Sequence, residues 1–361
     1  QSDGQIYQHG DFRDPYVFFN EDEKQWWLLV GAREAGVVGQ RSGCVGLAKS
    51  TNLLDWSLVE PLWAPRIGPH ADCPQLLEHQ GTWYLFYLQR FTRYRTAASP
   101  AGPWERGNPR NLDCRMAAAG SRPAFDGKRW ISLPFIITPK QDAALGELGE
   151  WGYGGPLAVP REWDFHADML ITVHAPREII EAMHQARPQE RLPLDQARVL
   201  TGQWAVAVDK NEAQCLSESG GSLLLGGVPE HFYLEADLLC SRDTMDAHVI
   251  FNTDDTLESG YLLELAPDDD HAILRGISHW DVDRELVWQS VALQPNTSTK
   301  IRIFRSGSVV DIFLGDTATL THRLYRYSGG DIVLEFIDGS GRFEDLFMCE
   351  LSNLQTAGEV S

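Results

Sequence analysis

The sequence predicts an all-β fold, and two observations support this prediction. Short apolar runs alternate with turn signals up to about residue 160, and longer runs that alternate apolar and polar residues follow from about residue 199. Short strands at regular spacing are typical of a sandwich, a barrel or a propeller, and alternating strands are typical of a β-sandwich. We therefore expect a propeller portion at 1–175, a helical linker at 176–198 and a β-sandwich at 199–361.

The first region is expected to hold short strands separated by polar or glycine-containing turns. Aromatic and β-branched residues dominate these runs, as strands prefer. The expected strands are 16–19, 26–30, 43–48, 57–60, 83–88 and 130–135, and the segment 152–159 follows them.

Two segments of this region resemble each other. Asp14-Pro15 and Asp72-Cys73-Pro74 each open an apolar strand, which is followed by a turn and an aromatic strand. A repeated four-stranded unit with a carboxylate on its innermost strand is what a propeller blade would give. The alternative for each aspartate is a solvated acid in a turn.

The linker and the second region carry different signals. Residues 176–187 are expected to form one short helix, because Pro176 stands near its start, and 188–193 is a polar segment bounded by prolines. The strands expected after it are 232–239, 247–251, 261–265, 272–277, 286–293, 299–304, 309–314 and 332–337.

Composition limits the function classes. The formal net charge of −20 argues against nucleic acid and anionic membrane surfaces as partners and is compatible with a neutral small-molecule or oligosaccharide substrate. No apolar run is long enough to span a membrane, and six scattered cysteines show no metal-binding spacing. We expect no metal, no cofactor and a cytoplasmic location, or secretion if a signal peptide has been removed.

The stretch 11–18 is the first candidate for a site. Arg13 lies between Asp11 and Asp14, and Pro15 fixes the backbone directly after Asp14. A guanidinium can fork onto a carboxylate or a sugar hydroxyl, so this arrangement would hold a carboxylate rigidly at the mouth of a site. A charged turn with a structural Arg13–Asp14 ion pair is the alternative.

Four motifs, in order, resemble those of glycoside hydrolase family 32, the invertases and fructan hydrolases. They are Phe12-Arg13-Asp14-Pro15, Asp72-Cys73-Pro74 with the strand behind it, the segment 155–162, and the segment 308–314 with 321–325. The resemblance covers nearly the whole chain. It implies a five-bladed propeller followed by a β-sandwich, and retaining hydrolysis of fructosides such as sucrose, fructo-oligosaccharides or fructans.

The resemblance also implies roles for individual residues. Asp14 takes the position of the transition-state stabiliser, Arg13 that of a positioning residue and Asp72 that of the acid/base, and retention needs the two catalytic carboxyl groups roughly 5–5.5 Å apart. Met116 stands where the family usually has an aromatic residue, which suggests a changed sugar pocket. Trp26, Trp63 and Trp151 are candidates for sugar stacking, with packing in the core as the alternative.

Two departures from the family pattern leave alternatives open. The family nucleophile precedes the Arg-Asp-Pro motif, and only 12 residues precede Arg13 here, so we expect a fragment, an oligomer or second chain that completes the propeller, or another mechanism. Asp72 replaces a glutamate and is one methylene shorter. A non-catalytic carbohydrate-binding or interaction protein on the same scaffold is therefore the alternative to a hydrolase.

Overall fold

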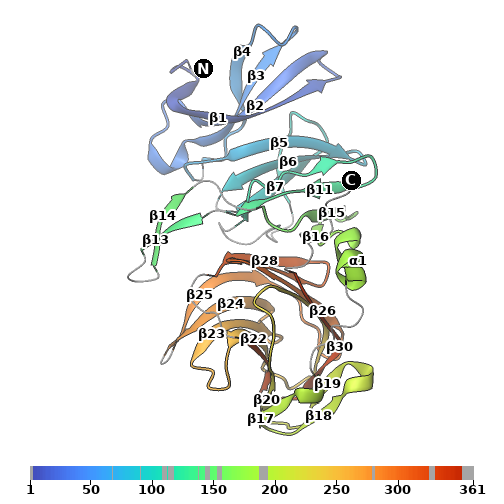
Figure 1. Ribbon diagram of the computed structural model, residues 1–361. Helices are drawn as coiled ribbons and strands as arrows, with labels where there is room; N and C mark the ends of the chain where they lie inside the picture. The colour runs from blue at the N-terminus through green and yellow to red at the C-terminus, as the bar shows by residue number, and fades with distance from the viewer. Residues whose placement is uncertain are drawn as a thin grey trace, which may run out of the picture. The chain divides into compact units, whose positions relative to one another are not determined.

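The computed structural model describes residues 3–66, 68–89, 91–107, 112, 118–136, 138–142, 147–152, 157–186, 194–278, 281–324 and 330–351. Strands dominate these residues, and one α-helix and three short 3-10 helices (39–41, 194–196 and 208–210) occur among them (Figure 1). The all-β prediction is confirmed.

The chain divides into two compact units. The first is built from residues within 1–112, 119–133 and 163–171, and the second from residues within 113–118, 134–162 and 172–361. The boundaries expected at 175 and 199 stay predictions.

Two four-stranded antiparallel sheets form most of the first unit. The strands run in chain order in each sheet, as in the blades of a propeller (Figure 1). The repeated four-stranded unit predicted from the two Asp-Pro segments is therefore confirmed. The strands are β1 (Tyr7–Asn20), β2 (Gln25–Glu34), β3 (Gly43–Ser50) and β4 (Ser57–Trp63), then β5 (Asp72–His79), β6 (Thr82–Gln89), β7 (Phe91–Ala97) and β8 (Glu105–Arg106).

Apolar side chains from both sheets form one cluster in this unit. Trp27, Leu29 and Val45 of the first sheet pack with Leu76 and Leu85 of the second, and all five are at least 95% buried. Because burial of each large apolar side chain contributes about 1.5–3 kcal/mol, this cluster holds the two sheets against each other.

Shorter strands follow in the middle of the chain. They form one sheet with the order β10-β11-β15-β16 and the two-stranded pairs β12-β9 and β13-β14. Their bounds are β9 Ala118–Ala119, β10 Ala124–Phe125, β11 Trp130–Ser132, β12 Phe135–Ile136, β13 Thr138–Asp142, β14 Glu147–Gly152, β15 Arg161–Phe165 and β16 Ile171–His174.

Two seven-stranded antiparallel sheets form the sandwich of the second unit. One has the order β17-β20-β29-β22-β23-β24-β25 and the other the order β18-β19-β30-β21-β26-β27-β28. Inward-facing side chains of both sheets form the largest apolar cluster of the described structure. The bounds are β17 Arg198–Thr201, β18 Trp204–Ala207, β19 Glu212–Cys215, β20 Gly220–Leu225, β21 Phe232–Cys240, β22 Asp246–Thr253, β23 Ser259–Ala266, β24 His271–Ser278, β25 Asp281–Ser290, β26 Thr299–Ser306, β27 Val309–Leu314, β28 Ala318–Arg323, β29 Asp331–Ile337 and β30 Gly341–Glu350.

Helix α1 (Arg177–Ala186) covers part of the second sheet. It begins after Pro176, as predicted, and its Met183, Ile179 and Ile180 pack on Tyr233 and Phe304. Phe304 lies between Ile303 and Arg305 on β26 and Ile303 points into the sandwich, so α1 lies on the outer face of this sheet. The other sheet has no such helix among the described residues.

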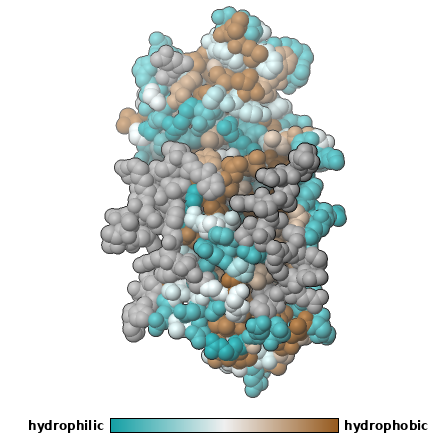
Figure 2. Space-filling view, viewed as in Figure 1, coloured by the Kyte–Doolittle hydropathy of each residue, from teal (hydrophilic) through white to brown (hydrophobic). Residues whose placement is uncertain are grey.

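On the face that Figure 2 shows, hydrophilic residues separate the hydrophobic patches. No helix of the described structure is long and apolar enough to cross a membrane.

A buried arginine fixes the segment before β15 to the sandwich. Arg161 Nη2 donates to Asp311 Oδ1 (2.8 Å) and to Thr321 Oγ1 (2.6 Å), and Asp311 Oδ2 accepts the Val159 N–H at 2.8 Å. The guanidinium lies 4.8 Å from the ring centroid of Phe313. Arg161 and Asp311 are each 1% exposed, so removing either partner would leave a buried charge uncompensated.

We therefore expect Asp311→Ala to lower the free energy of unfolding by about 3–5 kcal/mol, because Arg161 loses its counter-charge in a dry site. Urea unfolding followed by tryptophan fluorescence measures this loss. Glu181→Ala is the matched control, since it breaks only the exposed Arg177–Glu181 pair of α1 and should cost no more than about 0.5 kcal/mol. Equal losses in the two variants would contradict the account.

Candidate functional site

Asp14 stands at an irregularity in β1. The pairing register of β1 and β2 shifts between Arg13 and Tyr16, and Asp14 has a left-handed backbone with φ of 57°. Aspartate tolerates this conformation better than most residues. A bulge at this point turns the Asp14 side chain out of the regular alternation of the strand.

Cys73 stands at the equivalent point of β5. The β5–β6 register shifts between Asp72 and Gln75, and Cys73 has φ of 49°. The two irregularities meet, because Asp14 Oδ2 accepts the Cys73 N–H at 3.0 Å and lies 3.4 Å from Cys73 Sγ. One carboxylate therefore connects the innermost strands of two successive sheets.

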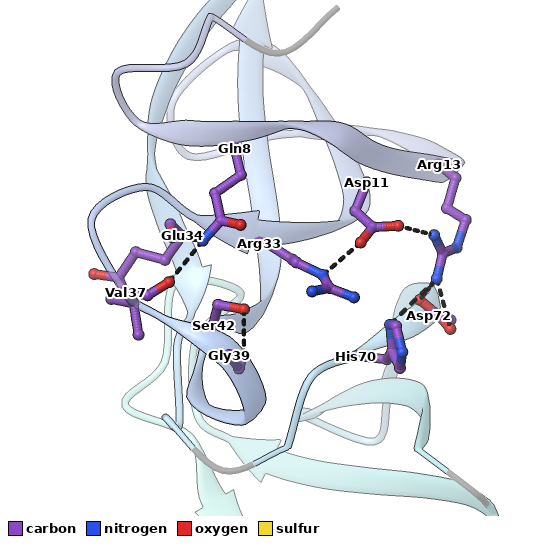
Figure 3. A network of polar contacts seen from close by, with 10 residues as sticks. All are labelled: Gln8, Asp11, Arg13, Arg33, Glu34, Val37, Gly39, Ser42, His70 and Asp72. Carbon is purple, nitrogen blue, oxygen red and sulfur yellow. Dashed lines mark hydrogen bonds and ion pairs between the residues drawn. The ribbon is translucent and has the colours of Figure 1, made fainter.

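Arg13 joins the second aspartate to the first sheet (Figure 3). Its Nη2 lies 3.0 Å from Asp72 Oδ1 and 3.2 Å from Asp72 Oδ2, and it donates to His70 Nδ1 at 3.3 Å. Its Nη1 donates to Asp11 Oδ1. The structure thus brings together Arg13, Asp14 and Asp72, which the sequence singled out.

Arg33 and Asp11 support this arrangement from behind. Arg33 Nε pairs with Asp11 Oδ2, so the Asp11 carboxylate lies between two guanidinium groups (Figure 3). Burial alone would raise the pKa of Asp11, but the hydrogen bond from Arg13 and the charge of Arg33 outweigh it and lower that pKa. The sequence analysis missed Arg33. The signal that could have identified it is the β1–β2 hairpin, because Phe12 pairs with Ala32 and continuing that register sets Asp11 opposite Arg33.

Gly31 lets β2 approach the site closely. A Cβ atom there would lie 3.2 Å from the Asp72 Cα, 3.3 Å from its Oδ1 and 3.2 Å from the Ala71 carbonyl oxygen. These distances are tighter than ordinary contacts, so any larger residue would displace Asp72. Sequence reasoning missed this glycine, and no local pattern marks it.

A small pocket adjoins Cys73 in the first unit. It is lined by Cys73, Phe86, Tyr87, Leu88, Thr92, Gly120, Ser121 and Arg122. The Arg122 guanidinium is close enough to lower the pKa values of Cys73 and Tyr16, although burial dominates both groups and raises them. Arg122 therefore adds a cation near Asp14 that the sequence analysis did not single out.

The remaining predicted sugar-binding residues lie elsewhere or outside the described side chains. Trp63 packs 4.6 Å from Tyr87, with the Arg95 guanidinium 5.1 Å from its ring, inside the apolar cluster of the first unit. Trp26 packs against Phe19 near the β1–β2 turn, five residues along β2 from Gly31. Met116 and the side chain of Trp151 lie outside the described structure. All four roles stay predictions.

The arrangement has a defined chemical capacity. Two carboxylates and one guanidinium lie together on neighbouring strands, which suits hydrogen bonding to the hydroxyl groups of a sugar and proton transfer at a glycosidic oxygen. Among the described side chains, no three His, Cys, Asp or Glu residues are grouped so that they could hold a metal ion.

The Cys73 thiol provides a test of this geometry. Burial, and next the charge of Asp14, raise its pKa to about 12. Because the thiolate is the reactive form, we expect Cys73 to react with iodoacetamide at pH 8 on the order of a thousandfold more slowly than a free cysteine of pKa about 8.5. Mass mapping of the labelled peptides measures this rate.

Asp14→Asn should speed this alkylation, because it removes a charge that opposes the thiolate. Asp55→Asn is the control, since Asp55 is exposed and bonds only to Asn52. If Asp14→Asn left the Cys73 rate unchanged, the Asp14–Cys73 contact would be wrong.

Comparisons with known proteins place these observations in context. Residues 2–103 match the family model described as "Glycosyl hydrolases family 32 N-terminal domain". The chain is 25% identical over 338 residues to the raffinose invertase of Escherichia coli. The aligned region covers 87% of this chain and 61% of that protein. The chain therefore spans about three fifths of the length of this curated relative.

Solved structures show the same fold. The structure of the sucrose-6-phosphate hydrolase of Lactobacillus gasseri matches with a TM-score of 0.61 at 16% identity. The superposition covers 96% of this chain and 67% of the hydrolase chain. The structure of the exo-inulinase of Aspergillus awamori matches with a TM-score of 0.62 at 15% identity. The superposition covers 96% of this chain and 68% of the inulinase chain.

Proposed function

We propose that the chain is a member of glycoside hydrolase family 32 and that it hydrolyses fructosides such as sucrose, fructo-oligosaccharides or fructans by a retaining two-carboxylate mechanism. One observation carries the proposal: the bulges of β1 and β5 bring Asp14, Asp72 and Arg13 into a single contact network. The raffinose invertase relative and the solved neighbours support the substrate class.

Asp14 is proposed as the transition-state stabiliser. Its Oδ2 is held by the Cys73 backbone, and Oδ1 makes no hydrogen bond to any described residue. A carboxylate fixed on one oxygen can offer the other to a sugar hydroxyl without first being reoriented, which is how preorganised groups favour the transition state.

A cytoplasmic location and a second chain that completes the propeller stay predictions beside this proposal.

Asp72 is proposed as the acid/base. Both of its oxygens lie within 3.2 Å of Arg13 Nη2, which orients the carboxyl group before a sugar binds. Arg13 is only half-buried, so its guanidinium has room to shift to a sugar hydroxyl and release one Asp72 oxygen for proton transfer. None of the described residues is assigned the role of the nucleophile.

A carbohydrate-binding protein without turnover is the second candidate. The observation that favours it is the short Asp72 side chain, which is already engaged by Arg13. Sugar binding measured by calorimetry without product formation would support this candidate, and turnover by the full chain would exclude it.

Asp72→Asn should lower kcat/KM for sucrose by a factor of about 10²–10⁴, which is the usual contribution of a positioned acid or base. Asp14→Asn should lower it by a factor of about 10²–10³, which is the usual cost of removing one preorganised group that stabilises the transition state. Release of reducing sugar measures the rate. Asp22→Asn, in the exposed turn between β1 and β2, is the control and should leave kcat/KM unchanged. Undiminished hydrolysis in the first two variants would refute the assignment.

Asp72→Glu is expected to raise kcat by up to about a hundredfold, because a misplacement of about 1 Å can cost that much. The added methylene restores the reach of the glutamate for which Asp72 stands in. A rise in kcat with Asp14 intact, and none in an Asp14→Asn background, would confirm that the two carboxyl groups act in one site. A fall in kcat would show that Asp72 already has the correct length.

A further inference from the structure

A row of side chains crosses the outer face of the sheet that has no helix against it. Antiparallel partners share a face, and the strand registers align one residue from each strand. Thr201 pairs with Ser222, Ser222 with Glu335, Glu335 with His248, His248 with Glu264, Glu264 with Ile273, and Ile273 with Trp288. The neighbours of these residues in sequence, such as Ala247, Val249, Leu263 and Leu274, face the core, so the row faces outward.

One half of the row is a directed hydrogen-bond chain. The Thr201 hydroxyl donates to Ser222 Oγ (3.1 Å), and the Ser222 hydroxyl donates to Glu335 Oε1 (2.7 Å). Glu335 Oε2 lies 2.7 Å from His248 Nδ1, which therefore carries the proton. Because Ser222 donates to Glu335 and not to His248, this group is not a hydrolytic triad.

The chain ends on an unsatisfied atom. His248 is 9% exposed, and its Nε2 is buried without a hydrogen-bond partner among the described residues. A buried polar atom without a partner costs about 1–3 kcal/mol, and because Nε2 is enclosed by the protein, it lies beneath the surface that a ligand would touch.

The other half of the row carries a charged group and an aromatic ring. Glu264 accepts two hydrogen bonds from Arg275 (2.8 and 3.1 Å) and lies 3.5 Å from His271 Nε2. The side chains of Glu264 and Arg275 are 17% and 24% exposed, so both contact solvent. Trp288, partly exposed, lies beside them at the end of the row.

The geometry points to a second carbohydrate-binding site on this sheet face, with Trp288 as the stacking surface and Glu264 and Arg275 as the partners of sugar hydroxyl groups. Carboxylate and guanidinium groups bind hydroxyls in a fixed orientation, and an amphipathic aromatic ring covers the apolar face of a sugar ring. The described charged side chains next to Glu264 include the acids Asp246 and Glu335 and the cation Arg275, so this part of the surface disfavours anionic ligands and suits a neutral saccharide.

The site is separate from the Asp14–Asp72 site in sequence and in fold, and the choice of a fructan as its ligand rests on the proposed function. We would titrate the full chain carrying Asp14→Asn, which should slow turnover, with the tetrasaccharide nystose in a calorimeter. Adding Trp288→Ala or Glu264→Gln should weaken this residual binding by about tenfold or more, which corresponds to about 1.4 kcal/mol. Each of these changes alone should leave kcat/KM for sucrose unchanged.

Trp56→Ala is the control, because Trp56 is a partly exposed tryptophan of the first unit whose indole donates to the Leu53 carbonyl at 3.0 Å. It should leave nystose binding unchanged. Cellotetraose, titrated in parallel, distinguishes a fructan site from a site for other neutral saccharides, and binding of either that depends on Trp288 supports the inference.

Binding of neither sugar, or binding that Trp288→Ala and Glu264→Gln both leave intact, would overturn the inference. If the unsubstituted chain did not hydrolyse sucrose, that result would count against the proposed function alone, because the calorimetric measurement does not depend on turnover.

Discussion

The hydrogen bond from the Cys73 backbone to the Asp14 carboxylate is the contact on which the site depends. It joins two strands that belong to different sheets, and it forms only because both residues adopt a left-handed backbone at a break in strand pairing. Strain of this kind costs on the order of 1–3 kcal/mol per residue and persists where the surroundings enforce it. Here the apolar cluster shared by the two sheets enforces it, and the strained positions are Asp14 itself and Cys73, the residue next to Asp72.

The charged side chains around this contact form a chain of successive ion pairs. Arg33 pairs with Asp11, Asp11 with Arg13, and Arg13 with Asp72, so each charge is compensated by the next (Figure 3). The chain leads from the more enclosed Arg33 side chain to the half-buried Arg13. In the proposed site, a sugar that bound Arg13 would compete only with the Arg13–Asp72 pair, while the Asp11–Arg13 pair would keep the guanidinium oriented.

Much of the fold could be predicted from local pattern. The repeat of Asp14-Pro15 and Asp72-Cys73-Pro74 predicted two equivalent four-stranded sheets, and Pro176 marked the start of α1. The contacts of the site could not be predicted in this way. The strand pairing shifts its register directly after Arg13 and directly after Asp72, and no residue type in the sequence indicates these shifts. The same limit applies to Gly31, whose role depends on the approach of another strand, and to Trp288, which joins His248 and Glu264 only through the registers of four strands.

The central claim is that Asp14 and Asp72 serve one retaining reaction on a fructoside. Proton NMR of the first fructose released from sucrose by the full chain tests it most directly, before the sugar mutarotates. Retention predicts β-fructofuranose as the first product, because two displacements restore the configuration of the substrate. The α anomer as the first product would contradict the retaining mechanism, and the absence of any product would favour a protein that binds carbohydrate without hydrolysing it.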